Sequence, residues 1–272
     1  MRAVFDARII ALDFDGTIGN TGAPSPNGMN VHKAYDMALY RVFGVKGILA
    51  AVGGLQNRAP IELLQDVLRE LNDLRSVAGA YYRGNRARLI RRGAHLPDRR
   101  CTIEALAEAF VWVKLDILLG EIGKTEDGSI WPMPCEGVLE FLAQASAQGK
   151  KIAVISSGHE LFIRKCFEMW GAPCPRYLLT DDDLRNLPFP VAKKTKPSKL
   201  LYTLLSVKMK CPIGDLQDSV YFGDDAFKDG MLAENAYVPF GWYNPEGKPA
   251  GRHMNGGHFE FRDWRELLLQ PA

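Results

Sequence analysis

The 272-residue sequence contains few cysteines, and they are not paired along the chain. There are five, an odd number, and neither a CxxC nor an HExxH motif occurs. Disulfide frameworks and zinc sites need clustered cysteines or histidines, so we expect free thiols and a reducing compartment. His253 and His258 lie in a glycine-rich stretch, and we interpret them as loop residues rather than metal ligands.

Long apolar runs are missing as well. The stretch nearest to one, residues 47–55, is short and glycine-rich, whereas a helix that crosses a bilayer needs about 20 apolar residues. Acidic residues at positions 6, 13 and 15 interrupt the apolar run that a signal peptide would need. We therefore expect a cytoplasmic protein without a membrane partner.

The sequence also lacks an excess of charge of either sign, because 34 basic residues are balanced by 32 acidic ones, for a formal net charge of +2. This balance does not indicate a nucleic-acid partner. The composition, 47% hydrophobic and 24% charged, is that of an ordinary globular protein. It leaves the oligomeric state open.

What the sequence does contain is an alternation of strands and helices. Residues 8–12 form a short apolar run that ends at Asp13, which is typical of a buried strand. Strands separated by helices indicate βαβ units and a parallel sheet. Further strands are predicted at residues 151–156, 176–179, 219–222 and 236–240, and helices at residues 136–148, 160–170 and 197–208.

A helical block interrupts this alternation after the first strand. Apolar residues recur there at three- and four-residue spacing, which predicts amphipathic helices. The segments with this spacing are residues 31–43, 60–74 and 101–119, and the flanking segments, residues 19–30 and 123–134, are rich in turn residues.

The predicted fold class is therefore α/β. We expect a Rossmann-like parallel-sheet core formed by residues 1–18 and 132–272. Residues 19–131 are predicted to form an inserted α-helical cap domain.

Polar residues follow several of the predicted strands. In open α/β sheets the carboxyl ends of the strands meet at one edge, where ligands bind. The residues expected at this edge are Asp13, Asp15, Gly16 and Thr17 after the first strand, Ser156 and Ser157 after the second, and Asp224, Asp225 and Asp229 after residues 219–222, with Lys196 before a helix.

Several carboxylates at one edge would repel each other unless a cation neutralised them. Donor sets made of oxygen alone suit Mg²⁺, which also binds substrate phosphates. Ser156 and the amides that open the next helix are suitable phosphate donors, and Lys196 adds a positive charge. The pattern thus predicts a magnesium site that binds a phosphoryl group.

These groups resemble, in the same order, the motifs of the haloacid dehalogenase superfamily. Residues 13–17 resemble the DxDGT motif, and Ser156 in VISSG resembles the second motif. Lys196 in TKPSKLL resembles the third, and Asp224 with Asp225 in YFGDDAFKD resembles the acidic fourth. The place of the helical block is similar to that of a type-1 cap, as in hydrolases of the phosphoglycolate phosphatase kind.

The resemblance implies roles for these residues. Asp13 would be the nucleophile and form an aspartyl-phosphate. Asp15 would protonate the leaving oxygen and then activate water. Mg²⁺ would be held by Asp13, the backbone carbonyl of Asp15 and Asp224, with Asp225 and Asp229 competing for the second acidic position.

Phosphate binding is expected from a second set. It comprises Ser156, Ser157, Lys196, Gly16 and Thr17. Ser156 is favoured over Ser157 by its register with the other motifs. Lys196 is favoured over its lysine neighbours because Pro197 is expected to mark the start of a helix.

Other polar clusters have simpler interpretations. Asp181, Asp182 and Asp183 are interpreted as a solvated turn rather than a second metal site. The basic run from Arg83 to Arg92 is interpreted as an exposed helix face, with recognition of a second anionic group on the substrate as the alternative.

The expected activity is hydrolysis of a small phosphorylated metabolite. Phosphomutase and phosphonatase chemistry stay open, the latter with Lys33 or Lys46 nominated only by position. Carbon–halogen hydrolysis is disfavoured because Asp15 is present, and a non-catalytic binding protein would be expected to lack Asp13 or Asp15. Residues 238–264 suggest a last strand and a docking helix, with no chemistry assigned.

Overall fold

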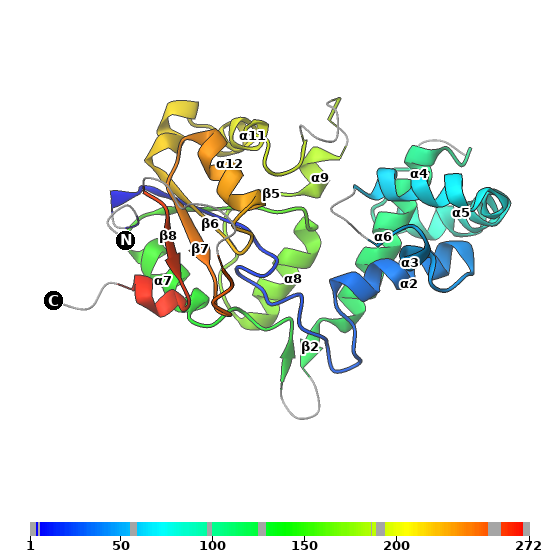
Figure 1. The fold of residues 1–272 in the computed structure, drawn as a ribbon, viewed down its shortest axis with the longest axis horizontal. Coiled ribbons are helices and arrows are strands. Elements are labelled where there is room, and N and C mark those ends of the chain that lie inside the picture. Colours follow the sequence, from blue (N-terminus) through cyan, green and yellow to red (C-terminus); the bar gives the residue numbers. More distant parts are fainter. Residues whose placement is uncertain are drawn as a thin grey trace. The chain divides into compact units, whose positions relative to one another are not determined.

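The computed structural model describes residues 4, 6–54, 59–96, 100–124, 129–185, 187–188, 194–249 and 257–268. The chain forms two compact units (Figure 1). The core unit comprises Met1–Thr21 and Pro132–Ala272, and the helical unit comprises Gly22–Trp131.

The core unit keeps three residues that the sequence analysis assigned to the helical domain. Gly19 forms isolated bridges with Asp15 and Pro134, and the amide of Asn20 donates to the carbonyl of Met133 at 2.8 Å. These backbone bonds tie the outgoing and returning chains together inside the core unit.

The core is built on a six-stranded, wholly parallel sheet in the order β5-β4-β1-β6-β7-β8. Its strands are β1 (Ile9–Leu12), β4 (Lys151–Ile155), β5 (Tyr177–Leu179), β6 (Ser219–Gly223), β7 (Phe240–Tyr243) and β8 (Phe259–Phe261). The central strand β1 pairs with β4 on one side and β6 on the other. The α/β class predicted from the sequence is confirmed.

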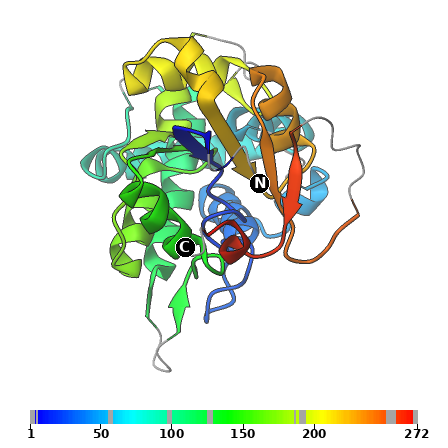
Figure 2. The same ribbon diagram turned by 90° about the vertical axis from the view of Figure 1, so that its left-hand side faces the viewer.

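Helices cover both faces of this sheet. They are α7 (Val138–Ala147), α8 (Glu160–Trp170), α9 (Asp181–Leu184), α11 (Leu200–Met209) and α12 (Lys228–Ala236), with 3-10 turns η2 (Ile213–Asp218) and η3 (Trp264–Leu267). In Figure 1, α11 and α12 lie on one face of the sheet, and α7 and α8 lie on the other. Figure 2 shows β8 beside β7 at one edge of the sheet, and η3 lies against α7.

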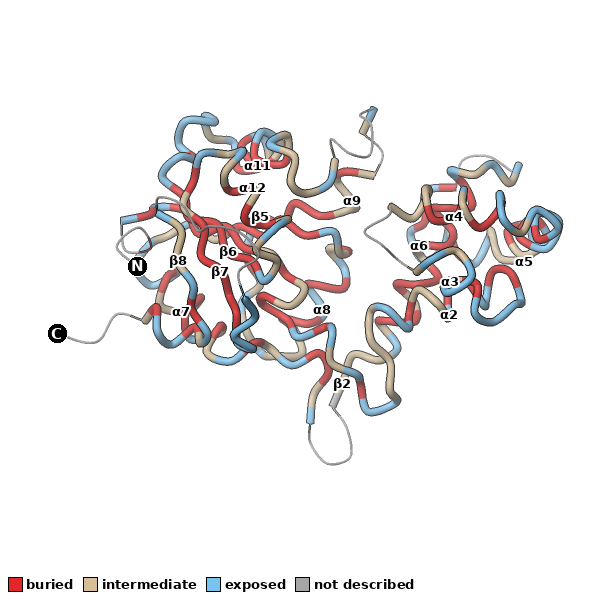
Figure 3. Tube along the Cα trace, viewed as in Figure 1, coloured by how far each residue is buried: buried red, intermediate tan, exposed pale blue. Residues whose placement is uncertain are grey.

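Side chains along each strand point alternately to the two faces of the sheet and pack against the helices on both. Ile9 and Ala11 face a core shared with Leu205 of α11 and Leu232 of α12. Phe222 points the other way, and its ring centroid lies 5.6 Å from that of Phe141 in α7. Because both faces are covered, β1, β6 and β7 are buried along their whole length (Figure 3), as expected for a parallel sheet.

Several predicted boundaries are wrong, and two of them lie in the core unit. The strand expected at residues 236–240 begins only at Phe240, because α12 continues to Ala236 and Tyr237 ends it in the left-handed region (φ 59°). The helix expected from Pro197 begins at Leu200, so Lys196 lies in the turn before it.

The helical unit contains α2 (Val31–Phe43), α3 (Ile48–Ala51), α4 (Pro60–Glu70), η1 (Asn72–Leu74), α5 (Arg75–Arg91) and α6 (Ile103–Glu121), followed by the hairpin strands β2 (Gly123–Lys124) and β3 (Ile130–Trp131). α6 is buried along most of its length and packs against α2, α4 and α5. Asn30 and Thr102 cap α2 and α6 by accepting from the amides of Lys33 and Ala105. Among the described helices, none combines the length and apolar character needed to span a bilayer.

We predict that Gly241→Ala destabilises the core unit. A Cβ atom at Gly241 would lie 2.4 Å from the ring of Phe222 and 2.9 Å from that of Phe259. Overpacking of this kind costs about 1–3 kcal/mol. Gly214→Ala is the control, because nothing lies within 4 Å of its added Cβ. Urea unfolding should separate the two variants, and equal midpoints would contradict the prediction.

Candidate active site

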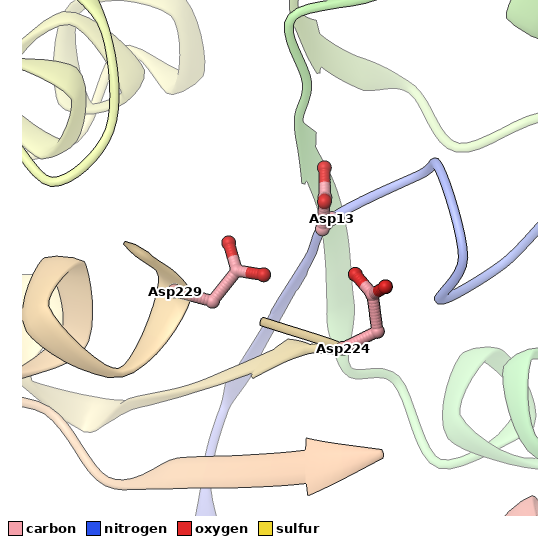
Figure 4. A group of neighbouring side chains, drawn as sticks. All are labelled: Asp13, Asp224 and Asp229. Atoms are coloured by element: carbon pink, nitrogen blue, oxygen red, sulfur yellow. The ribbon is translucent and has the colours of Figure 1, made fainter. Parts of the chain in front are cut away.

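Three carboxylates meet at the carboxyl edge of the sheet (Figure 4). Asp13 follows β1, Asp224 follows β6, and Asp229 lies in the first turn of α12. One carboxylate oxygen from each lies within 4.8 Å of the others. The sheet therefore brings Asp13 close to two acidic residues that are more than 200 positions away in the chain.

Lys196 supplies a positive charge to this cluster. Its Nζ lies 2.7 Å from Oδ1 of Asp13 and 2.8 Å from Oδ1 of Asp229. Lys194 instead donates to the carbonyls of Arg185 and Leu187, and Lys193 lies outside the described residues. Burial alone would lower the pKa of Lys196, but Asp13 and Asp229 hold this pKa above its ordinary value, so the ammonium stays charged.

Asp229 and Asp225 have different positions. Asp229 is 1% exposed, and it accepts from the hydroxyl of Tyr221 at 3.1 Å and from the amide of Asp225 at 3.2 Å. The carboxylate of Asp225 accepts from the amides of Phe227 and Lys228, at the start of α12. Asp229 therefore joins the acidic cluster, whereas Asp225 caps the helix.

Close packing of two loops depends on glycine. Gly16 has a φ of +75°, and a Cβ there would lie 2.4 Å from Oδ2 of Asp224. A Cβ at Gly223 would lie 2.3 Å from Cγ of Asp229. Thr17 is fully buried, with its hydroxyl 3.4 Å from Oδ1 of Asp224. Gly16 and Thr17 thus shape the acidic cluster, and phosphate binding by them stays a prediction.

The negative charge of the cluster exceeds what Lys196 offsets. Burial raises the pKa of Asp13, and the negative charges of Asp229 and Asp224 raise it further, whereas the positive charge of Lys196 opposes this rise. Asp224 is partly accessible to solvent. Partial desolvation and the charge of Asp229 nevertheless raise its pKa to about 6. Oxygen donors that carry excess negative charge fit a hard divalent cation such as Mg²⁺.

Asp15 is held by a residue that the sequence analysis did not identify. The hydroxyl of Thr21 donates to Oδ1 of Asp15 at 2.7 Å, and Thr21 is 3% exposed. A Cβ added at Gly158 would lie 3.5 Å from Oδ2 of Asp15 and 3.1 Å from Oγ of Ser156. Asp15 and the loop after β4 are therefore neighbours.

The loop after β4 has its own internal bonds. The amide of Ser156 donates to the carbonyl of Leu179 in β5, and Oγ of Ser156 accepts from the amide of Gly158 at 2.9 Å. Ser156 is buried and Ser157 is exposed. Which hydroxyl binds a phosphoryl group stays a prediction.

Asp182 fastens this loop to α9. Its carboxylate accepts from the amide of Glu160 at 2.8 Å and lies 3.0 Å from Nδ1 of the buried His159. Burial alone would raise the pKa of Asp182, but the bonds from His159, Glu160 and Arg185 lower it to about 2. The neighbouring Asp183 also binds Lys208. Both carboxylates therefore form bonds within the protein, and the interpretation of residues 181–183 as a solvated turn is wrong.

Comparison with known proteins identifies the fold. No family model and no curated protein sequence matches the chain. CbbY from Rhodobacter sphaeroides, solved in complex with phosphate, shares 17% identity with a TM-score of 0.53, over 96% of both chains. A mutant of CbbY in complex with xylulose-(1,5)bisphosphate gives the same values.

Two further solved structures are similar over 96% of both chains. A predicted phosphoglycolate phosphatase from Haemophilus somnus shares 14% identity with a TM-score of 0.51. A 2-haloacid dehalogenase from Pseudomonas syringae pv. Tomato shares 19% identity with a TM-score of 0.50. The chain thus has the fold of the haloacid dehalogenase-type hydrolases, as its motifs predicted.

We predict that Asp182 stabilises the core in a pH-dependent manner. A folded-state pKa near 2, below the ordinary value of 3.8, favours folding above about pH 4. This contribution, on the order of 1–2 kcal/mol, is lost as the pH falls toward 2. Asp182→Asn should therefore lower the melting temperature at pH 7 and lower it less at pH 3. Thermal unfolding followed by circular dichroism measures both, and a difference that does not change with pH would exclude this origin.

Proposed function

We propose that the protein is a Mg²⁺-dependent phosphohydrolase of the cytoplasm that acts on a small phosphorylated metabolite. The observation that carries the proposal is the convergence of Asp13, Asp224 and Asp229 with Lys196 at the carboxyl edge of the sheet. The five free cysteines support a reducing compartment.

Asp13 is the nucleophile in this proposal. Its position at the end of the central strand fixes its backbone, since its amide donates to the carbonyl of Phe222 in β6 at 2.8 Å. A carboxylate oxygen of Asp13 forms a bond to phosphorus while the ester P–O bond breaks, which gives an aspartyl-phosphate and the leaving alkoxide. The ion pair with Lys196 opposes the rise in the pKa of Asp13 that burial causes, so it favours the ionised form, and it orients Asp13 for this attack.

Asp15 moves the protons. In the first half-reaction it donates a proton to the leaving oxygen, so the product departs as an alcohol. In the second, it takes a proton from water as that water attacks phosphorus and the bond to Asp13 breaks, which releases inorganic phosphate. The hydrogen bond from Thr21 holds one carboxylate oxygen of Asp15, and Thr21 thereby orients the second oxygen, which transfers the proton.

The cation has a specific place in the proposal. Asp13, Asp224 and Asp229 would hold it, and it would offset the charge that develops on the transferred phosphoryl group. Lys196 contributes to the same neutralisation from the side of Asp13 and Asp229. We propose no metal role for Asp225, because its carboxylate caps α12.

The helical unit is proposed to act as the cap that selects the leaving group. In α5, Arg83, Arg88 and Arg91 are exposed, which is compatible with binding a second anionic group of the substrate. Of the two lysines nominated for phosphonatase chemistry, Lys33 donates a hydrogen bond from its Nζ to the carbonyl of Gly28 at 2.7 Å. The nitrogen that a Schiff base would require is therefore already engaged by the backbone.

We predict Mg²⁺-dependent release of inorganic phosphate from p-nitrophenyl phosphate and from members of a panel of metabolite phosphates. EDTA should abolish turnover, and Asp13→Asn should lower kcat by about 10³-fold or more because the nucleophile is lost. Asp215→Asn is the matched control, since Asp215 is exposed in η2, before β6 and so at the opposite edge of the sheet. Folded protein that binds Mg²⁺ and turns over no panel member would favour the mutase or phosphonatase alternatives.

A second prediction concerns Thr21. Thr21→Val keeps the shape of the side chain but removes the donor to Asp15, and a hydrogen bond to a charged group is worth about 1.5–3 kcal/mol. We expect kcat to fall about 10-fold or more with KM nearly unchanged. Thr21→Ser retains the hydroxyl and should retain most of the activity. Equal kinetics for the valine and serine variants would show that the bond does not position Asp15.

A further inference from the structure

The C-terminal part of the chain reaches both acidic loops through two tryptophans. Nε1 of Trp242, in β7, donates to the backbone carbonyl of Asp224 at 3.0 Å. Nε1 of Trp264, in η3, donates to the backbone carbonyl of Thr17 at 3.2 Å. No chemistry can be assigned to residues 238–264 from their sequence alone.

Trp264 is fixed by its surroundings. It is 0% exposed, and its ring centroid lies 4.9 Å from those of Phe141 and Phe261 and 5.1 Å from that of Phe222. Asp263 caps η3 by accepting from the amide of Arg265. The direction of the indole N–H is therefore set by packing against three buried rings.

Trp242 is fixed in a different way. It is 3% exposed, belongs to the core layer beneath α11 and α12, and lies opposite Gly223 in the parallel register of β6 and β7. The residue after Gly223 is Asp224, so the indole bonds to the chain where it leaves the sheet. The bond holds the peptide group that follows the Cα atom of Asp224, and the side chain of Asp224 projects from that Cα atom.

These loops need such support because of what they carry. The carboxylates of Asp13, Asp224 and Asp229 lie close together and repel one another. The side chain of Asp224 also packs against Gly16, where no Cβ would fit. A small shift of the Asp224 backbone would therefore change the spacing of the acidic oxygens.

We infer that Trp242 is a positioning residue for cation binding, because its indole N–H holds Asp224 in the geometry that the cluster requires. Trp264 does the same for the loop that carries Asp13 and Asp15. This inference rests on the proposed function, since it concerns the cation expected at that site. It assigns to the last part of the chain the task of completing the metal centre.

The test is the affinity for Mn²⁺, which replaces Mg²⁺ at oxygen sites and is counted as free ion by electron paramagnetic resonance. Trp242→Phe keeps an aromatic ring and removes only the donor. We expect its dissociation constant for Mn²⁺ to rise about 10-fold, the effect of one hydrogen bond of ordinary strength. Trp131→Phe is the matched control, because Trp131 donates to the carbonyl of Ala23 at 2.8 Å within the helical unit.

The outcomes are distinguishable. Weaker binding by Trp242→Phe with unchanged binding by Trp131→Phe supports the inference, whereas wild-type affinity in a folded Trp242→Phe protein overturns it. Should Trp242→Phe fail to fold, Trp264→Phe decides by the same criterion. Absence of Mn²⁺ binding by the wild-type protein would instead overturn the proposed function, and the inference with it.

Discussion

The mutual repulsion of carboxylates at one edge of the sheet is the constraint on which the rest of this structure depends. Asp13, Asp224 and Asp229 lie within reach of a single ion, and the only ammonium that the described residues place against two of them belongs to Lys196. One positive charge does not offset three negative ones. Burial and this repulsion together raise the pKa of Asp13 and of Asp224, so the arrangement favours a further cation.

Rigid surroundings are what keep such a cluster together. Asp13 is attached to the central strand of a parallel sheet whose two faces are covered. Gly16 and Gly223 allow carboxylates to approach the backbone where any side chain would collide with them. Asp229 is fixed by Tyr221, whose own pKa is raised by burial, so that the phenol remains a donor. None of these supporting residues adds a negative charge to the carboxylate that it contacts.

Much of the fold and part of the site could be predicted from the sequence. The periodicity placed α2 and α8 at their observed bounds, and the strand-then-acid pattern placed Asp13 and Asp224 at one edge. The sequence correctly indicates Lys196 as the lysine that contacts Asp13, although the helix expected from Pro197 begins at Leu200. The choice between Asp225 and Asp229 depends on α12 starting at Lys228, and local spacing does not determine a helix start to one residue.

The supporting residues could not be found in this way. Thr21, Trp242 and Trp264 each act through one hydrogen bond, and Asp182 acts through its bonds with His159, Glu160 and Arg185. No motif or periodicity records such bonds, because any residue with a suitable donor or acceptor at the right place in the fold can make them. They become visible only when the packing that orients each side chain is known.

The same bonds bear on how a phosphoryl group would be held. Amides at the start of α8 were expected to bind phosphate, as helix N-termini commonly do. In the structure the amide of Gly158 donates to Oγ of Ser156, and that of Glu160 donates to Asp182. These two donors are already engaged, so a larger share of the charge of a bound phosphoryl group would have to be offset by Lys196 and by the proposed cation. The acidic cluster, which alone would repel an anion, would become through that cation the part of the site that attracts it.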